Sequence, residues 1–555
     1  MKTLKIDMKH AFIRFFKNET LTYMYALSIL AIVAKFLKMM KLNSSSDGFD
    51  AYVMPLVTCL EMVKYLFVFF LFLTFEYLYM LKSAALEETV GGISNGIRRY
   101  ESGSLSVCVI GAFVYWVLIA LLNTAGGIFL GNKDMAYIVQ SSFTLFVFVF
   151  GNLLLASLLA WVTSKYFGRI ISYFILVGMV LFSSFYFEEI SALLLEMGVN
   201  IYPFQELFTI MPTGLRWMPN FQNPFVVQPK QMALIAAWIF GLYTLAKIHR
   251  NFEQKRSRVY WVSGFICMIA VCMFCAPSSN ILMNENPAGT VMESQMYYGN
   301  DTGSREADFE KFEAVSYKME MTINTQLKNS VEIEVTPCNL DCYAFTLHHG
   351  FQVKRVSDQN GKKLRFSQME DALYIYNDDS KDISLLNIYY KGGSATYYSN
   401  ALAIYLPGDF PYYPQPGIHD VYDRERYGYQ SNFLEKEAYF EVNISGHSNI
   451  YSNLDSTKKG SYKGYCRGPI FLKGLLKKYD YREVTVTYPY LDKDFSEETI
   501  KKWIDTLKDG LGVSCPDKIF FQPSVNQPKV IHKGDDYIIA PYMFDPKQYT
   551  DEGME

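Results

Sequence analysis

The first half of the chain contains seven apolar runs, and each is long enough to cross a lipid bilayer as a helix. They lie near residues 21–41, 53–80, 105–130, 136–162, 168–188, 231–248 and 259–276. The hydrocarbon core of a bilayer is about 30 Å thick and is crossed by about 20 helical residues. Because no water satisfies the backbone there, a spanning segment of this kind must be helical. The pattern predicts an α-helical transmembrane bundle of seven spans over residues 21–276.

The average composition hides a sharp change of character along the chain. The 555 residues are 50% hydrophobic and 16% aromatic with a net charge of −3, yet the first half is apolar and the second half polar. A net charge this close to zero gives no reason to expect a nucleic-acid partner. No cleavable secretory signal is expected, because no small-residue cleavage site follows the first apolar run.

Residues 1–20 alternate basic and apolar side chains, which is typical of an amphipathic helix lying in the membrane interface. The basic positions are Lys2, Lys5, Lys9, Arg14 and Lys17. An ordinary charged N-terminal tail is the alternative.

The positions of Lys and Arg predict the orientation of the spans, because cytoplasmic loops carry more of these residues. With the N-terminus in the cytoplasm, ten basic residues of later connections also lie inside: Lys82, Arg98, Arg99, Lys165, Arg169, Lys247, Arg250, Lys255, Arg256 and Arg258. Lys35, Lys38 and Lys41 run against the rule and must snorkel to the outer interface. Seven spans then place everything after about residue 277 outside a plasma membrane, as the extracytoplasmic part of a multi-pass protein.

A polar passage, KSAALEETVGGISNGIRRYESGS, separates the second and third spans at residues 82–104. It begins with acidic residues, continues with small ones and ends with basic ones. We expect a short helix that lies along the cytoplasmic membrane face and offers both signs of charge to a soluble partner. The predicted contact residues are Leu86, Glu87, Glu88, Arg98 and Arg99.

A long outer connection, residues 188–230, holds an apolar stretch that prolines interrupt. It is predicted to form re-entrant or interfacial helices and to serve as an outer gate. Four charged residues are candidate pathway or gate residues: Glu61, Lys64, Glu188 and Glu189. Charge within a membrane is costly and usually functional. Equally, Glu61 and Lys64 can pair with each other or reach the interface, and both interpretations stay open.

Beyond a linker at residues 277–310, the period of apolar residues changes to two, which indicates strands. Residues 311–491 are predicted to form a β-sandwich-like domain, and residues 492–555 a short α/β tail. Asn360-Gly361 marks a hairpin turn. One helix is expected at residues 495–511, with Ser496 as its cap and Glu497 and Glu498 in its first turn. The expected strands are residues 317–327, 331–335, 344–347, 364–366, 373–376, 383–390, 401–406, 439–444 and 483–488.

The sequence contains no motif that predicts nucleotide binding or zinc-dependent catalysis by this chain. No G-x-x-x-x-G-K-[ST] is present, so ATP and Mg²⁺ are expected on a partner. No histidine begins an H-E-x-x-H zinc motif, and the adjacent His348 and His349 are expected on a strand, pointing to opposite faces, where they cannot easily share one metal. No catalytic residue, metal or cofactor is therefore assigned.

Four of the nine cysteines lie in the polar half: Cys338, Cys342, Cys466 and Cys515. Four thiols allow three pairings, which the sequence cannot separate. In an oxidising compartment we expect Cys338–Cys342 and Cys466–Cys515.

The first half resembles an ABC type-two transporter permease. The resemblance rests on the amphipathic N-terminal segment, the passage from Leu86 to Arg99 after the second span, and the interrupted outer loop before the sixth. It implies that Leu86–Arg99 is a coupling helix that docks on a nucleotide-binding subunit, and that two permeases form the pathway.

The second half resembles the N-terminal β domain of gluzincin aminopeptidases, some of which are fused to such permeases. The stretch from Phe345 to Phe351, the Tyr- and Pro-rich loop ending at Asp423-Arg424, and residues 519–541 carry this resemblance. Since the zinc motif is absent, no peptidase activity or catalytic residue is transferred.

The sequence thus predicts the permease subunit of an ATP-driven ABC transporter, with export as the expected direction. Its expected partners are a cytosolic ABC ATPase, a second permease copy or homologue, and the lipid membrane. The alternative is a membrane-anchored extracytoplasmic binding or sensor protein without transport.

Overall fold

The computed structural model divides the chain into two compact units, which are described separately. One contains Met1–Pro219 and Val227–Ser278, and the other Asn220–Val226 and Ser279–Glu555. The structure describes residues 2–45, 54–84, 87–93, 96–183, 229–248, 258–275, 298, 312–324, 326–379, 381–394, 396–400, 403–423, 428–489, 496–510, 516–522, 532–533 and 537–540, with isolated positions between 187 and 211.

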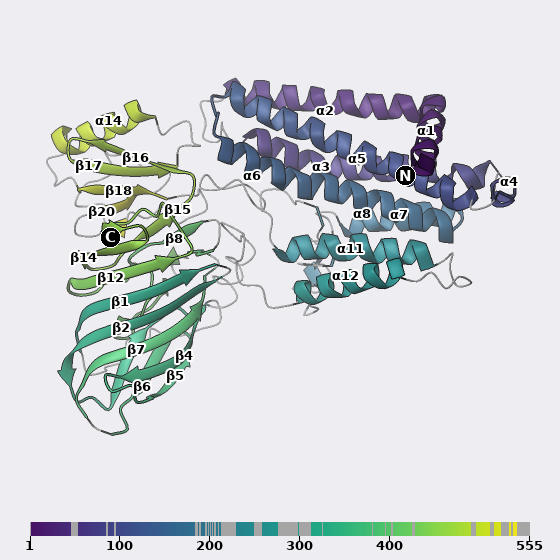
Figure 1. Ribbon diagram of the computed structural model, residues 1–555. Coiled ribbons are helices and arrows are strands. Elements are labelled where there is room, and N and C mark those ends of the chain that lie inside the picture. Colours follow the sequence, from purple (N-terminus) through teal and green to yellow (C-terminus); the bar gives the residue numbers. More distant parts are fainter. Residues whose placement is uncertain are drawn as a thin grey trace. The chain divides into compact units, whose positions relative to one another are not determined.

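The first unit, here the helical unit, is built from long helices that run alongside one another, while α1 lies across one of their ends (Figure 1). Its helices are α1 (Lys2–Lys17), α2 (Glu19–Ser45), α3 (Met54–Ser83), α4 (Glu87–Gly91), α5 (Gly96–Phe129), α6 (Met135–Leu145), α7 (Asn152–Tyr166), α8 (Arg169–Phe182), α11 (Pro229–Ile248) and α12 (Arg258–Cys275). A π-helical turn, Phe146–Gly151, joins α6 to α7.

Four helical segments of the described residues are long and apolar enough to cross a membrane. They are residues 19–41, 54–83, 96–129 and 135–166. Three shorter apolar helices occupy residues 169–182, 231–247 and 259–273. The predicted helical membrane unit is confirmed in this coarse form, whereas the count of seven spans is not, because within the described residues four segments meet both the length and the hydropathy of a span.

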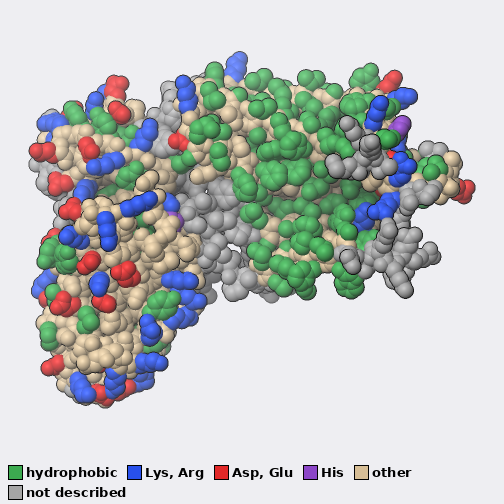
Figure 2. Space-filling view, viewed as in Figure 1, with side chains coloured by type: hydrophobic (Ala, Val, Ile, Leu, Met, Phe, Trp, Pro, Cys, Tyr) green, Lys and Arg blue, Asp and Glu red, His purple; other side chains and the backbone are tan. Residues whose placement is uncertain are grey.

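The centre of the helical unit is formed by α3 and by the continuous segment from α6 to α7. In their most apolar windows 61% and 72% of the residues are buried, against 22% for α2 and 28% for α5. Apolar side chains that other helices leave uncovered therefore form a wide band on the surface, as Figure 2 shows. Such a surface is suited to lipid rather than to water.

The second unit, here the β unit, is mostly β, as predicted. Its largest sheet has seven strands in the order β13 (Asp455–Lys458), β14 (Ser461–Cys466), β12 (Ala438–Ser445), β1 (Ala314–Ile323), β2 (Leu327–Cys338), β7 (Ile383–Gly392) and β4 (Phe351–Asp358). A second sheet contains β5 (Arg365–Met369), β6 (Ala372–Tyr376), β3 (Cys342–Thr346) and β9 (Gln415–Pro416). Two small ribbons pair β15 (Phe471–Lys473) with β8 (Ile404–Leu406) and β10 (Tyr422–Asp423) with β11 (Gly428–Tyr429).

The alternation of side chains builds the core of the β unit. On β1 the buried side chains are Tyr317, Met319, Met321 and Ile323, at every second position. They share one hydrophobic cluster with residues of the four-stranded sheet, such as Tyr343 and Phe345. This is the pattern expected when two sheets bury their facing sides together.

The last part of the β unit is a five-stranded sheet with one helix. Its strands are β16 (Leu476–Tyr481), β17 (Val484–Pro489), β18 (Lys518–Phe521), β20 (Tyr537–Ala540) and β19 (His532–Lys533). Helix α14 (Glu497–Asp505) connects β17 to the parallel strand β18. The Ser496 hydroxyl accepts the amide N–H of Thr499, which confirms the predicted cap. The predicted turn is confirmed as well, with Gly361 at φ +75°.

The environment of His447 allows a prediction of how the folding stability of the β unit depends on pH. Burial and the neighbouring Lys473 ammonium lower the pKa of His447, whose Nδ1 lies within hydrogen-bond distance of that ammonium. A histidine with a lowered folded-state pKa is protonated first in the unfolded chain, so folding stability is lost as the pH falls below about 6.5. We expect His447→Gln to remove this part of the loss.

The measurement is the amide hydrogen exchange of β12 in the full chain at several values between about pH 5 and 8. His419→Gln is the matched control, because the Nε2 of His419 lies 3.0 Å from the Pro416 carbonyl rather than beside a lysine. An unchanged pH dependence in the His447 variant would contradict the assignment.

Candidate functional site

The described part of the polar passage between α3 and α5 contains the short helix α4 and the turn that follows it. The N–H of Gly92 donates to the Glu88 carbonyl at 3.0 Å, and the N–H of Gly96 donates to the Ile93 carbonyl at 2.8 Å. A Cβ atom on Gly96 would collide with the carbonyl oxygen of Val90. The tight return into α5 therefore requires a glycine at position 96.

The predicted contact residues divide into exposed and engaged ones. Glu88 and Arg98 are exposed. The Arg99 guanidinium pairs with the Asp7 carboxylate of α1 at 2.8 Å. Leu86 and the side chain of Glu87 lie outside the described residues, although Glu87 begins α4. Two charges of opposite sign thus remain available at the surface of this connection.

Helix α1 is docked firmly on α5 and α3 next to this connection (Figure 1). A Cβ atom on Gly103 would lie 2.8 Å from the Asp7 carbonyl oxygen, so only glycine lets the two helices approach this closely. The Arg14 guanidinium lies 3.6 Å from the Tyr100 ring centroid and donates to the Ser104 hydroxyl at 2.5 Å. The Tyr77 hydroxyl donates to the Ala11 carbonyl at 2.9 Å. An amphipathic N-terminal helix was predicted, but these partners were not.

Basic residues from several helices gather at the same end of the helical unit, which we call the α1 end. Lys165 of α7 pairs with Glu101 of α5 at 3.1 Å and donates to the Ala246 carbonyl of α11 at 3.0 Å. Lys82 of α3 donates to the Lys165 carbonyl at 2.8 Å. Arg169 of α8 pairs with Glu76 of α3 at 2.9 Å. These polar contacts join α3, α5, α7, α8 and α11. They involve Lys82, Lys165 and Arg169, which were predicted to lie on the cytoplasmic side. Figure 2 shows Lys and Arg side chains at this end of the unit.

The structure describes two of the four predicted pathway or gate residues, Glu61 and Lys64. Glu61 and Lys64 are both exposed on α3, and Lys64 Nζ lies 5.1 Å from the Tyr65 ring centroid. Among the ion pairs of the described residues none joins Glu61 to Lys64. Glu188 and Glu189 lie outside the described residues, as does most of the loop 188–230.

The predicted disulfide between Cys338 and Cys342 is not formed, and both thiols are free. Cys338 ends β2 in the seven-stranded sheet, while Cys342 begins β3 in the four-stranded sheet, so the chain changes sheet between them. Cys466 is buried at the end of β14, and Cys515 lies outside the described residues, so the predicted Cys466–Cys515 pair stays a prediction.

The expectation that His348 and His349 point to opposite faces of a strand is wrong. Strand β3 ends at Thr346, so both histidines lie in the turn that follows, with ring centroids 4.1 Å apart. His349 Nδ1 lies 3.0 Å from Asp371 Oδ1, and the Tyr298 hydroxyl donates to Asp371 Oδ2 at 2.9 Å. The sequence signal that was missed is Gly350, whose Cβ would collide with the Gly393 carbonyl and which marks the turn.

This histidine pair and Asp371 could hold one metal ion, since one ligand atom of each lies within 4.8 Å of the others. In the structure His349 and Asp371 are hydrogen-bonded to each other. His348 Nδ1 accepts the N–H of Gly350 at 3.1 Å, and a metal would have to displace that bond or bind at the other nitrogen. Burial raises the pKa of the Asp371 carboxyl, but the hydrogen bond from His349 and both imidazoles outweigh it and hold this pKa below its usual range.

Comparison with known proteins adds little to this geometry. No protein-family model matches the chain, and no curated protein matches it. Among solved structures, an M1 zinc metallopeptidase from Deinococcus radiodurans is similar over 42% of this chain and 61% of its own, at 11% identity and a TM-score of 0.27. Yeast LTA4 hydrolase is similar over 45% of this chain and 44% of its own, at 13% identity and a TM-score of 0.30.

This chain therefore spans less than two thirds of those structures. At such TM-scores the matches say nothing of activity.

The contact of α1 with α5 leads to a direct test. Gly103→Val places methyl groups against the Asp7 backbone, and overpacking of this kind costs about 1–3 kcal/mol. We expect α1 to detach more often and trypsin to cleave faster after the exposed Lys9 and Lys17 in the solubilised full chain. Gly178→Val on α8 is the control, because a Cβ there meets nothing within 4 Å. Equal cleavage of both variants would show that the close approach does not hold α1 in place.

Proposed function

We propose that this chain is the membrane permease subunit of an ATP-driven ABC transporter, with export as the expected direction. The observation that carries the proposal is the connection around α4. It is short and polar, it exposes Glu88 and Arg98, and it joins two long apolar helices, α3 and α5. A soluble motor that grips such a connection acts on two membrane helices at once.

The geometry supports α4 as the coupling helix. The tight return at Gly96 leaves little slack between α4 and the first turn of α5. The Arg99–Asp7 pair and the contact at Gly103 link that turn to α1. A push on α4 is thus passed to α5 and to the interfacial helix together. In this proposal nucleotide binding by the motor favours one of two arrangements of the helices.

The proposed topology has seven spans, with the N-terminus in the cytoplasm and the β unit outside. Helices α11 and α12 contain 20 and 18 residues, which at 1.5 Å per residue reach about 30 and 27 Å. The basic residues at the α1 end are what the positive-inside rule expects of a cytoplasmic face. The described part of α8 is shorter, at 14 residues.

The motor and the rest of the pathway are proposed to come from other chains. The sequence has no P-loop, so a separate ABC ATPase would bind ATP and Mg²⁺. A second permease copy would complete the pathway. No peptidase activity is proposed, because the sequence contains no H-E-x-x-H motif.

The test is whether the two exposed charges recruit an ATPase. When the tagged full chain is purified from its native membrane, we expect a P-loop ATPase to co-purify. The double variant Glu88→Ala/Arg98→Ala is expected to lose at least about nine tenths of it, since two interfacial charges that lose their partners cost a few kcal/mol. The matched control is Glu498→Ala/Lys502→Ala, an exposed ion pair on helix α14 of the β unit.

Equal recovery of the ATPase by both double variants would refute α4 as its docking site. If no ATPase is recovered with the unmodified chain, the membrane-anchored binding or sensor protein becomes the better account.

A further inference from the structure

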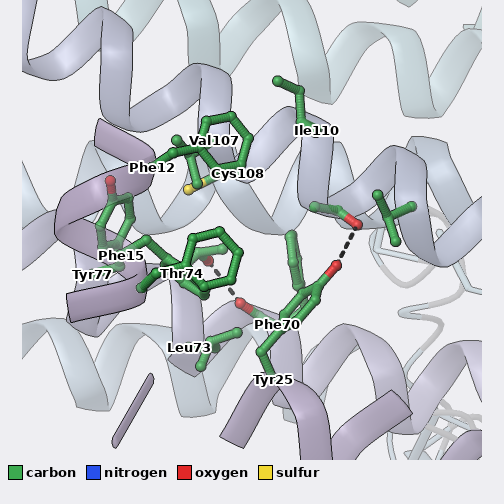
Figure 3. A pocket seen from close by; sticks show the side chains of 13 residues that line it. Phe12, Phe15, Tyr25, Phe70, Leu73, Thr74, Tyr77, Val107, Cys108 and Ile110 are labelled. Atoms are coloured by element: carbon green, nitrogen blue, oxygen red, sulfur yellow. Dashed lines mark hydrogen bonds between the residues drawn. The ribbon is translucent and has the colours of Figure 1, made fainter. Parts of the chain in front are cut away.

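A cavity of about 240 Å³ lies within the helical unit between α1, α2, α3 and α5 (Figure 3). Side chains of all four helices line it, and nearly all of them are apolar. The lining residues are Phe12, Phe15, Phe16, Tyr25, Phe70, Leu73, Thr74, Tyr77, Val107, Cys108, Ile110, Gly111 and Val114. Its volume is far larger than one water molecule needs.

The few polar groups in the lining already have partners within the chain. The Tyr25 hydroxyl donates to the Gly111 carbonyl at 3.3 Å, and the Thr74 hydroxyl donates to the Phe70 carbonyl at 2.7 Å, as the dashed lines in Figure 3 show. The Tyr77 hydroxyl donates to the Ala11 carbonyl at 2.9 Å. An occupant therefore needs no hydrogen-bonding group, and water would find few partners. The lining of the cavity therefore favours a hydrocarbon chain as its occupant.

The cavity extends from the surface into the interior of the unit. Phe70, Leu73 and Tyr77 are each at most 3% exposed, whereas Phe16 is 59% and Val114 42% exposed. The exposed residues belong to α1 and α5, and α5 is one of the helices that turn most of their apolar surface outward. A chain-like apolar molecule can thus enter from the surrounding lipid.

Basic side chains lie near the opening, together with the exposed Glu19 that begins α2. Lys17 follows Phe16 directly and is exposed, as is Lys9 on the same helix. The described acidic side chain of α1, that of Asp7, is engaged by Arg99. Basic side chains at the membrane surface attract anionic lipids, by about 1 kcal/mol per residue.

We propose that this cavity binds one acyl chain of an anionic phospholipid of the surrounding bilayer, with the headgroup held at Lys17. The bound chain fills the space between α1 and the pair α3 and α5. It thereby stabilises the docked position of α1, because a ligand that binds one arrangement shifts the equilibrium toward it. This proposal is independent of the proposed transport function.

The test uses phosphatidylglycerol that carries a photoreactive diazirine in one acyl chain, with the full protein in lipid nanodiscs. We expect crosslinks to concentrate on peptides containing residues 12–16, 70–77 and 107–114. Crosslinks spread evenly over the outward-facing helices, α8 included, would overturn the proposal, because they would report the general lipid boundary.

Gly111 offers a way to fill the cavity. A Cβ there meets the Phe70 ring at 3.6 Å and the Tyr25 ring at 3.8 Å, which is ordinary contact, so a larger side chain extends into the space. Gly111→Leu is expected to lower crosslinking at these peptides at least about tenfold, because the leucine replaces several methylene groups of the lipid. Gly178→Leu on α8, where a Cβ meets nothing within 4 Å, should leave it unchanged. Equal crosslinking of both variants would overturn the site.

The headgroup has its own test, which does not need a variant in the core. Lys17→Glu should remove the preference for phosphatidylglycerol over phosphatidylcholine carrying the same acyl diazirine, while crosslinks stay on the same peptides. A preference that persists in this variant would overturn the placement of the headgroup.

Discussion

The arrangement at the α1 end of the helical unit depends on the close approach of α1 to α5. Gly103 is the point of closest contact, because any side chain there would meet the backbone of Asp7. The approach allows Arg99 to reach Asp7 and Arg14 to lie on Tyr100. Both arginines are thereby held by partners within the chain. The helix that begins the chain is therefore part of the bundle and not a loose tail.

Local patterns in the sequence predicted much of the fold. The apolar runs correspond to helices, the change to a period of two corresponds to the β unit, and Ser496 caps its helix as expected. These features depend on neighbouring residues, so they can be read without knowing the tertiary contacts. The number of full-length spans was less predictable. The helix from Arg169 ends at Phe182 in the described residues, sooner than its apolar run suggested.

Features that depend on distant residues were missed. The parallel pairing of β1 with β12 joins residues such as Ser316 and Tyr439, and no local signal specifies it. The chain also changes sheet between Cys338 and Cys342, which no local signal specifies. Because β3 ends before His348, the side chains of His348 and His349 lie next to each other and not on opposite faces of a strand. At the α1 end, Arg99 was predicted to contact a soluble partner, whereas its partner within the chain, Asp7, lies 92 positions away and was not predicted.

The central proposal is that α4 and the β unit lie on opposite sides of the membrane, so that a motor on one side would act on helices that lead to the other. The most direct measurement is labelling with a membrane-impermeant maleimide in sealed vesicles of known orientation, on Gly92→Cys beside α4 and on Lys381→Cys in the β unit. Both positions are exposed, and the unmodified chain gives the background. The account predicts that Gly92→Cys reacts only in inside-out vesicles and Lys381→Cys only in right-side-out vesicles. Labelling of both positions in the same vesicles would contradict it.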